Sequence, residues 1–78
     1  MSTSVDDAVA VDVGIGQGEL RVRMRDGRTI SAPVSWFPRL AEASDAQRAD
    51  WRLIGAGEGI HWPQLDEDIS IAALLRGR

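Results

Sequence analysis

The alternation of apolar and polar residues near the N-terminus predicts a β-strand. Val9, Val11, Val13 and Ile15 are separated by small or polar residues, which gives the period of two that is typical of a strand with one buried face. The alternation ends at Gly16. We therefore predict that all four apolar side chains point into the core.

Residues 19–34 carry the clearest pattern in the chain, and it predicts a β-hairpin. Three apolar residues alternate with three arginines before an Asp-Gly pair, which is a typical turn signal. The arginines would then share the sheet face opposite the apolar side chains. The alternating residues are Leu20, Arg21, Val22, Arg23, Met24 and Arg25.

The length of the hairpin loop decides which residues lie opposite one another. A two-residue loop would place Ile30 opposite Arg23, on the charged face. A three-residue loop over residues 25–27 instead pairs Ile30 with Val22 and keeps the apolar face intact. It also places Gly27 at the left-handed position of such loops, which glycine adopts at no steric cost. We therefore predict the three-residue loop.

Beyond the hairpin the period changes and predicts two short helices. Ser35 is a suitable N-cap for the first helix, and Pro38 would lie in its first turn, where the amide hydrogen that proline lacks would be unpaired anyway. Ser44 and Gln47 have the spacing of a capping box, which predicts a second helix over residues 45–50.

Two further short strands, residues 51–54 and 60–62, are predicted on either side of a glycine-rich turn. The turn is not a phosphate-binding loop, because no Lys-Ser or Lys-Thr pair follows its last glycine. Trp51 and Trp62 belong to these strands, and both are predicted core residues because a tryptophan buries about 150–250 Å². Pro63 would end the second strand, since it cannot donate a ladder hydrogen bond.

A last helix is predicted over residues 71–75, with Ser70 as its N-cap and Gly77 just beyond its end. Three consecutive acids precede it. Because negative charge is stabilised near the N-terminus of a helix, we predict that these acids cap it, and contact with a partner's arginines is the alternative. The acids are Asp66, Glu67 and Asp68.

The length of 78 residues indicates one small domain. We expect a disordered tail over residues 1–7 and a single α+β domain over residues 8–78. The domain would combine a small antiparallel sheet with a β-hairpin at 19–34, two short helices in the middle, a second short strand pair and a short C-terminal helix. No cysteine is present, so disulfides cannot supplement the small core, and self-association or a protein partner would add stability.

The charge and hydropathy of the chain argue against several classes of protein. The net charge is −3, with nine arginines and no lysine, so we do not expect the chain to bind nucleic acid on its own. The apolar runs are far shorter than the roughly 20 residues of a membrane-spanning helix. Acids also stand where a signal peptide carries positive charge. The expected location is the cytoplasm, without a membrane partner.

His61 is the only histidine in the chain and the first candidate for a metal ligand or a catalytic residue. With the acids that follow, it lacks the spaced second histidine of a zinc site and the twelve-residue loop of a calcium site. As a general base, His61 would need a nucleophile to activate. The chain contains neither a cysteine nor a serine in a G-x-S-x-G nucleophile motif. We predict a half-exposed His61, no catalytic, cofactor-binding or metal site, and no enzymatic activity. A small metal-dependent enzyme centred on His61 is the last-ranked hypothesis.

Several residues are candidates for contact with a partner. The hairpin arginines would form a cationic stripe, which most often is a solvated face and otherwise contacts acidic groups. Trp36 and its neighbour Phe37 stand at a helix start, and whichever of them faces outward would be an aromatic interface anchor. The predicted partner-binding residues are Arg21, Arg23, Arg25, Trp36, Asp66, Glu67 and Asp68.

Three parts of the sequence together resemble a known family. They are DGRTISAPVSWFPRL, the element Ala43, Ser44, Gln47, Arg48 and Trp51, and IGAGEGIHWPQLDEDISIAALLRG. They resemble the small bacterial family called domain of unknown function 2442, over about residues 9–77 and most specifically over residues 59–75. The resemblance implies a small α+β domain that occurs alone or fused to a helix-turn-helix DNA-binding domain. Stand-alone members often accompany a second small protein thought to be a toxin.

The resemblance therefore implies a non-enzymatic protein-interaction or regulatory module. Its partner would be another protein, such as a small toxin, or a second copy of the chain. The most specific form of this expectation is the antitoxin of a toxin–antitoxin pair. The alternative is a DNA-associated transcriptional regulator module.

Overall fold

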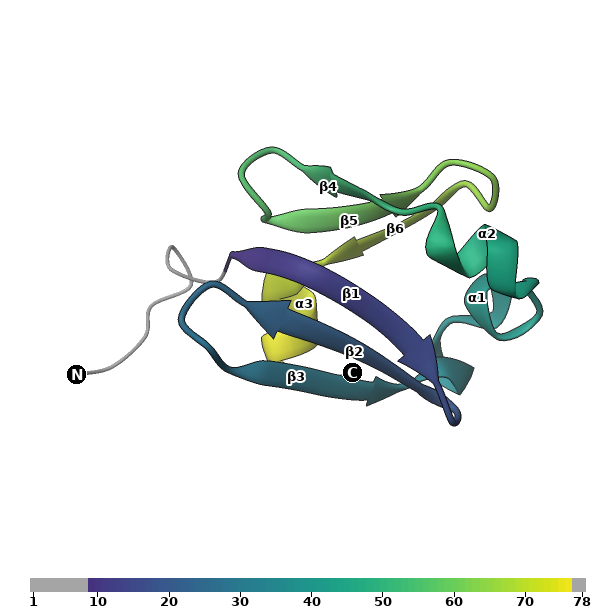
Figure 1. Cartoon of the computed structure of the whole chain (residues 1–78), viewed down its shortest axis with the longest axis horizontal. Coiled ribbons are helices and arrows are strands. Elements are labelled where there is room, and N and C mark those ends of the chain that lie inside the picture. The colour runs from purple at the N-terminus through teal and green to yellow at the C-terminus, as the bar shows by residue number, and fades with distance from the viewer. Residues whose placement is uncertain (1–8, 77–78) are drawn as a thin grey trace.

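The structure of the chain, a computed structural model, describes residues 9–76 and divides them between two three-stranded antiparallel sheets and several short helices (Figure 1). The fold is α+β, as the sequence predicts. The predicted tail at residues 1–7 and the predicted helix cap at Gly77 lie outside the described residues.

The first sheet is an antiparallel meander. Its strands, in spatial order, are β1 (Ala10–Gly16), β2 (Glu19–Met24) and β3 (Thr29–Pro33). Val22 lies opposite Ile30 and Leu20 opposite Ala32, which is the register of the three-residue loop. Gly27, the last residue of that loop, has a φ of 97°. The predicted hairpin is therefore confirmed together with its register.

The first strand departs from the predicted alternation because it contains a β-bulge. Ala10 pairs with Met24 while Asp12 pairs with Arg23, so Val11 is an extra residue on β1. Val11 is 44% exposed, whereas Ala10 is 1% exposed. The prediction that Val11 points into the core is wrong, because the bulge turns its side chain outward and places Ala10 inside.

Three short helical segments connect the two sheets. They are the 3-10 helix η2 (Val34–Trp36), α1 (Pro38–Ala41) and α2 (Asp45–Ala49). The prediction that Ser35 caps the first helix is wrong: Ser35 lies inside η2, and α1 begins only after Phe37, which provides no side-chain cap. Pro38 does occupy the first turn. The predicted capping box is confirmed, because Ser44 Oγ accepts from the Gln47 amide at 3.2 Å and Gln47 Oε1 accepts from the Ser44 amide at 2.9 Å.

The second sheet is also a meander, and it has one strand more than the predicted pair. Its strands, in spatial order, are β4 (Arg52–Ile54), β5 (Gly59–Trp62) and β6 (Glu67–Ser70). As predicted, a glycine-rich turn joins β4 to β5, and β5 ends before Pro63. The chain then turns through Asp66, which has a φ of 52°, and pairs with β5 again as β6.

The acids before the last helix do not cap it, contrary to the prediction. Glu67 and Asp68 lie within β6, where an extended backbone carries them away from the helix start, and Asp66 lies in the preceding turn. Helix α3 (Ile71–Arg76) follows β6 directly. The predicted cap at Ser70 is confirmed, because its Oγ accepts an amide hydrogen bond from the first turn of α3 at 3.3 Å.

The two sheets and α3 share one hydrophobic core. Helix α3 packs against β3 of the first sheet and β6 of the second (Figure 1). The turn between β4 and β5 also joins the sheets, because the Gly57 carbonyl accepts from the Ala10 amide at 2.8 Å. The largest fully buried residues are Leu20, Val22, Met24, Leu40, Ile60, Trp62 and Ile71.

The tryptophans differ in burial. Trp62 has 0% exposure, and its indole Nε1 donates to the Arg48 carbonyl at 3.0 Å, which ties β5 to the end of α2. This confirms Trp62 as a core residue. Trp51 and Trp36 are half-buried at the margin of the core, so the prediction for Trp51 is confirmed only in part.

Candidate functional site

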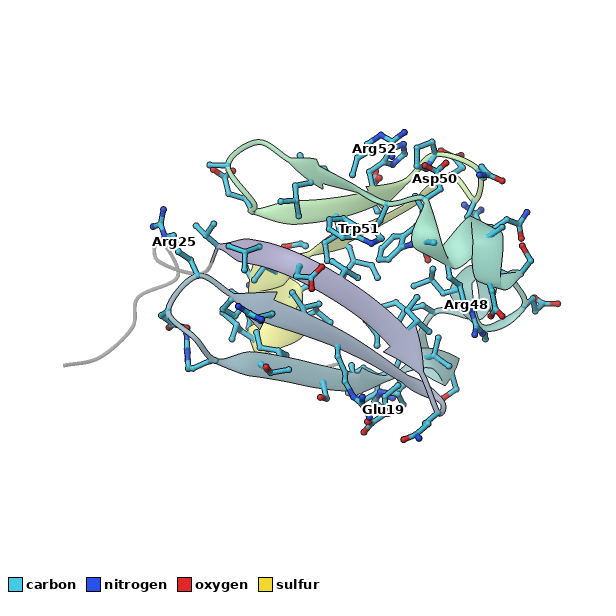
Figure 2. The ribbon with its side chains drawn as sticks, in the orientation of Figure 1. Glu19, Arg25, Arg48, Asp50, Trp51 and Arg52 are labelled. Atoms are coloured by element: carbon cyan, nitrogen blue, oxygen red, sulfur yellow. The ribbon has the colours of Figure 1, made fainter. Side chains whose placement is uncertain are left out.

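The predicted partner-binding arginines do not form one stripe. Arg21 and Arg23 are exposed on the outer face of the first sheet, as predicted, and Arg21 Nη2 pairs with Glu19 Oε1 of the same strand at 3.0 Å. Arg25 instead lies in the loop after β2, at the end of the sheet (Figure 2). Trp36 is half-buried in η2 and is only partly available as an anchor.

The three predicted acids also diverge. Glu67 and Asp68 are consecutive strand residues, so their side chains point to opposite faces of the second sheet. The backbone carbonyl of Asp66 accepts from Arg39 Nη1 at 2.6 Å, which fixes the turn before β6. The acids therefore provide no continuous acidic surface, and they lie apart from the arginines on another sheet.

A row of polar side chains crosses the outer face of the second sheet. Arg52 pairs with His61 across the strands, and His61 pairs with Asp68. His61 Nδ1 contacts Asp68 Oδ1, and the histidine side chain is 36% exposed, which confirms the predicted half-exposed position. Asp50 extends the row by accepting from Arg52 Nη1 at 2.8 Å and from Gln64 Nε2 at 3.0 Å. Figure 2 shows Asp50 and Arg52 side by side at this edge.

The polar row offers ion pairs and one imidazole–carboxylate contact. Within residues 9–76, no three histidine, cysteine, aspartate or glutamate side chains come close enough together to hold a metal ion. Ser70, on the neighbouring strand, has its Oγ engaged by the Ala73 amide. The contacts of the row join β5 to β6 through His61 and Asp68, and they join Asp50 to Gln64.

One residue of the row makes stability depend on pH. The hydrogen bond from Gln64 and the charge of Arg52 hold the pKa of Asp50 below its ordinary value of 3.8. The stability that Asp50 contributes is thus fully present above that ordinary pKa and is lost as pH falls through the lower folded-state pKa.

We predict that Asp50→Asn lowers the urea midpoint at about pH 6 and that its curve converges with wild type as pH falls toward about 2. The variant lacks a carboxylate whose protonation would otherwise destabilise the wild type. Gln64→Ala should give a similar convergence, because it removes the larger cause of the pKa shift. A midpoint difference that stays constant over this range would contradict the prediction. The hydrogen bond from the Arg28 amide also lowers the pKa of Asp26, so every variant should still lose some stability in acid.

A groove of about 370 Å³ lies between β1 and α2. Strand β1 forms one wall, and it is an edge strand because β2 is its only neighbour in the first sheet. Helix α2 and Trp51 form the other wall, and Figure 2 shows Trp51 between β1 and the second sheet. The groove is lined, besides Trp51, by Val13, Gly14 and Ile15 of β1 and by Asp45, Arg48 and Ala49 of α2.

The charged residues of the groove have different roles. Arg48 is held in place, because its Nε donates to the Leu40 carbonyl at 2.9 Å and its Nη2 to the Ala41 carbonyl at 3.1 Å. Its positive charge thereby compensates the carbonyl end of α1. Asp45 forms no ion pair within the described part of the chain. Asp45 lies in the first turn of α2, where the helix N-terminus compensates its negative charge, so the groove holds one acidic and one basic side chain.

None of the seven predicted partner-binding residues lines this groove. The sequence predicts Trp51 as a core residue and does not indicate its half-buried position at the groove wall. Alternation in the sequence indicates a strand, but it does not say which strand lies at the edge of a sheet. The groove exists because β1 lies at the edge of the first sheet and because α2 lies beside it.

The chain matches a known family over nearly its whole length. A family model described as protein of unknown function DUF2442 matches residues 8–78. The chain belongs to this family. The resemblance drawn from the sequence is thereby confirmed, and the match spans essentially all of the predicted single domain.

A solved structure resembles the DUF2442 domain described here. It is the crystal structure of a protein of unknown function from Rhodospirillum rubrum ATCC 11170, with a TM-score of 0.76 and 29% sequence identity. The alignment covers 90% of this chain and 87% of that one. No curated protein matches the sequence. Within residues 9–76, no helix has the length and apolar character that crossing a membrane requires.

Proposed function

We propose that this DUF2442 domain is a non-enzymatic protein-interaction module that holds a partner protein in the groove between β1 and α2. The observation that carries the proposal is the groove of about 370 Å³, whose walls are an edge strand and a helix. Ligand sites in proteins are commonly clefts of about 300–1,000 Å³. An edge strand adds backbone donors and acceptors that another polypeptide can use.

The chemistry of the groove favours binding over catalysis. Its side chains are mainly aliphatic or aromatic, and the guanidinium of Arg48 is engaged by backbone carbonyls. Nucleophilic catalysis requires a nucleophile beside a general base, and Asp45 is the only lining residue that could serve as either. His61 and Asp68 lie on the outer face of the second sheet and do not line the groove.

A regulatory role, such as that of an antitoxin, would be one use of this binding, and the partner would then be encoded near the domain. We do not extend the proposal to DNA. The net charge of −3 opposes phosphate binding, and Arg21 is already paired with Glu19.

The proposal predicts that blocking the groove abolishes partner binding. Ala49 lines the groove, and Ala46 is exposed on the same helix without lining it. We expect products of neighbouring genes, co-expressed with the domain, to include one that co-elutes with wild type and with Ala46→Arg in size exclusion. Ala49→Arg should weaken that complex by about tenfold or more, since it places a long charged side chain in the groove. No co-eluting neighbour, or equal elution with both variants, would contradict the proposal.

A further inference from the structure

The pairing of β1 with β2 determines which backbone groups of β1 are free. Gln17 and Gly18 form a two-residue turn with φ values of 53° and 78°, the type I′ geometry of tight hairpins. Gly16 and Glu19 flank this turn and pair with each other. They form a hydrogen-bonded pair, because such a turn is closed by a bond between its first carbonyl and its last amide.

Hydrogen-bonded and non-hydrogen-bonded pairs alternate along an antiparallel ladder. Counting from the turn, Gly14 bonds to β2, whereas Ile15 and Val13 do not. Ile15 and Val13 lie opposite Leu20 and Val22 in these non-bonded pairs. Their amide and carbonyl groups therefore point away from β2, toward the groove.

The other hairpin leads independently to the same alternation. The Met24 amide donates to the Arg28 carbonyl at 2.7 Å, so Met24 is bonded toward β3. Leu20 and Val22, at two-residue steps from it, direct their backbone groups toward β3 as well. Leu20 and Val22 therefore do not bond to β1, so the backbone groups of Val13 and Ile15, which lie opposite them, have no partner in β2.

The open stretch of this edge is short and coincides with the groove. Upstream, the Ala10 amide is occupied by the Gly57 carbonyl at 2.8 Å. Within residues 9–76, no backbone hydrogen bond outside the strand ladders reaches Val13 or Ile15. Both residues line the groove. An edge that presents such unpaired groups is a template for another strand.

The size of the groove limits what can occupy it. A strand residue within a sheet takes up roughly 160 Å³, from a strand spacing of about 4.8 Å, a sheet separation of about 10 Å and a rise of about 3.3 Å. The groove of about 370 Å³ therefore holds about two residues of one extended chain. Its second wall is formed by α2 and Trp51.

We propose that the partner enters this groove as a single extended segment carrying a basic residue and adds to β1 as a fourth strand of the first sheet. This rests on the proposed function and specifies its partner. The segment would exchange main-chain hydrogen bonds with Val13 and Ile15 and place apolar side chains against Trp51. The net charge of −3 favours a positively charged segment over a negatively charged one.

A second copy of the domain fits the groove less well. It would bring a whole sheet to an opening that holds one strand. The two copies would further repel each other through their equal net charges.

The first test uses a capped seven-residue peptide of alternating valine and arginine, with an alternating valine–glutamate peptide as the charge control. The basic peptide should bind at least about tenfold more tightly in an NMR titration. At saturation, hydrogen exchange of the Val13 and Ile15 amides should slow by about tenfold or more, while that of Gly14, already bonded to β2, should not change. Equal affinities, or protection outside this stretch, would overturn the proposal.

The second test methylates one amide nitrogen of the basic peptide at a time. Because only Val13 and Ile15 offer open backbone groups and alternate residues of an added strand face β1, loss of affinity should be confined to two peptide positions separated by one residue. A uniform or absent effect of methylation would overturn strand addition. If strand addition fails these tests but Ala49→Arg still abolishes the co-purified complex, the proposed function would still hold. A concentration-dependent dimer that Ala49→Arg dissolves would assign the groove to a second copy and also overturn the proposal.

Discussion

Replacing Trp62 with alanine is expected to lower the free energy of unfolding by about 3–5 kcal/mol. Trp62 has no exposed surface, and its removal leaves a cavity in the core shared by the two sheets. The whole domain has an expected stability of about 4–12 kcal/mol, from about 0.05–0.15 kcal/mol for each of its 78 residues. Urea unfolding followed by far-UV circular dichroism measures the loss, and much of the variant should be unfolded at 37 °C.

Trp62→Phe tests the contribution of the indole hydrogen bond separately from that of the cavity. Phenylalanine retains most of the apolar volume but cannot donate to the Arg48 carbonyl. Its expected loss is about 1–3 kcal/mol, the usual effect of leaving a buried acceptor without its partner. A loss from Trp62→Ala no larger than that from Trp62→Phe would show that core packing at this position is not the main contribution.

The parts of the fold that could be predicted are those where neighbouring residues favour one structure strongly. The hairpin of β2 and β3 is an example, because only the three-residue loop keeps Val22 and Ile30 on the apolar face. The capping box of α2 is another, since its two reciprocal bonds join Ser44 and Gln47 within one turn. These interactions are made within one hairpin or one helix turn and need no distant segment.

The features that sequence reasoning missed depend on contacts between distant segments. The bulge at Val11 leaves no signal in an alternation that looks regular, and its effect is to place Ala10 where its amide meets the Gly57 carbonyl. Strand β6 begins with two acids that resemble a helix-capping segment, and pairing with β5 makes it a strand. Every residue can accept a backbone ladder bond and every residue except proline can donate one, so composition alone does not identify such a strand.

The same distinction applies to the candidate site. Charged and aromatic residues were selected because interfaces favour them, but the structure distributes them over both sheets and η2. The groove between β1 and α2 is formed largely by small or aliphatic side chains and backbone. Its two walls are separated by about 30 residues of sequence, so no local motif could have revealed it.

Replacing Gly57 with alanine is expected to lower the free energy of unfolding by about 2–5 kcal/mol, because it combines backbone strain with a steric clash. Gly57 has a φ of 102°, which a residue with a side chain rarely adopts. An added Cβ would also lie 2.5 Å from the Ala10 carbonyl oxygen and 2.7 Å from Val9 Cγ1. The backbone of β1 cannot move aside without weakening the bond between the Ala10 amide and the Gly57 carbonyl.

Gly27→Ala is the matched control for this effect. Gly27 has a similar φ of 97°, but an added Cβ there would meet no atom within 4 Å, so its expected loss is the strain of about 1–2 kcal/mol alone. Equal losses of unfolding free energy in the two variants would mean that the backbone around Gly57 and Ala10 shifts to accommodate the added Cβ at little cost. If the clash is real, hydrogen exchange of the Ala10 amide should accelerate in Gly57→Ala and not in Gly27→Ala. Because this bond closes the upstream end of the open β1 edge, its loss would also extend the edge toward Ala10 and expose more strand for unspecific pairing.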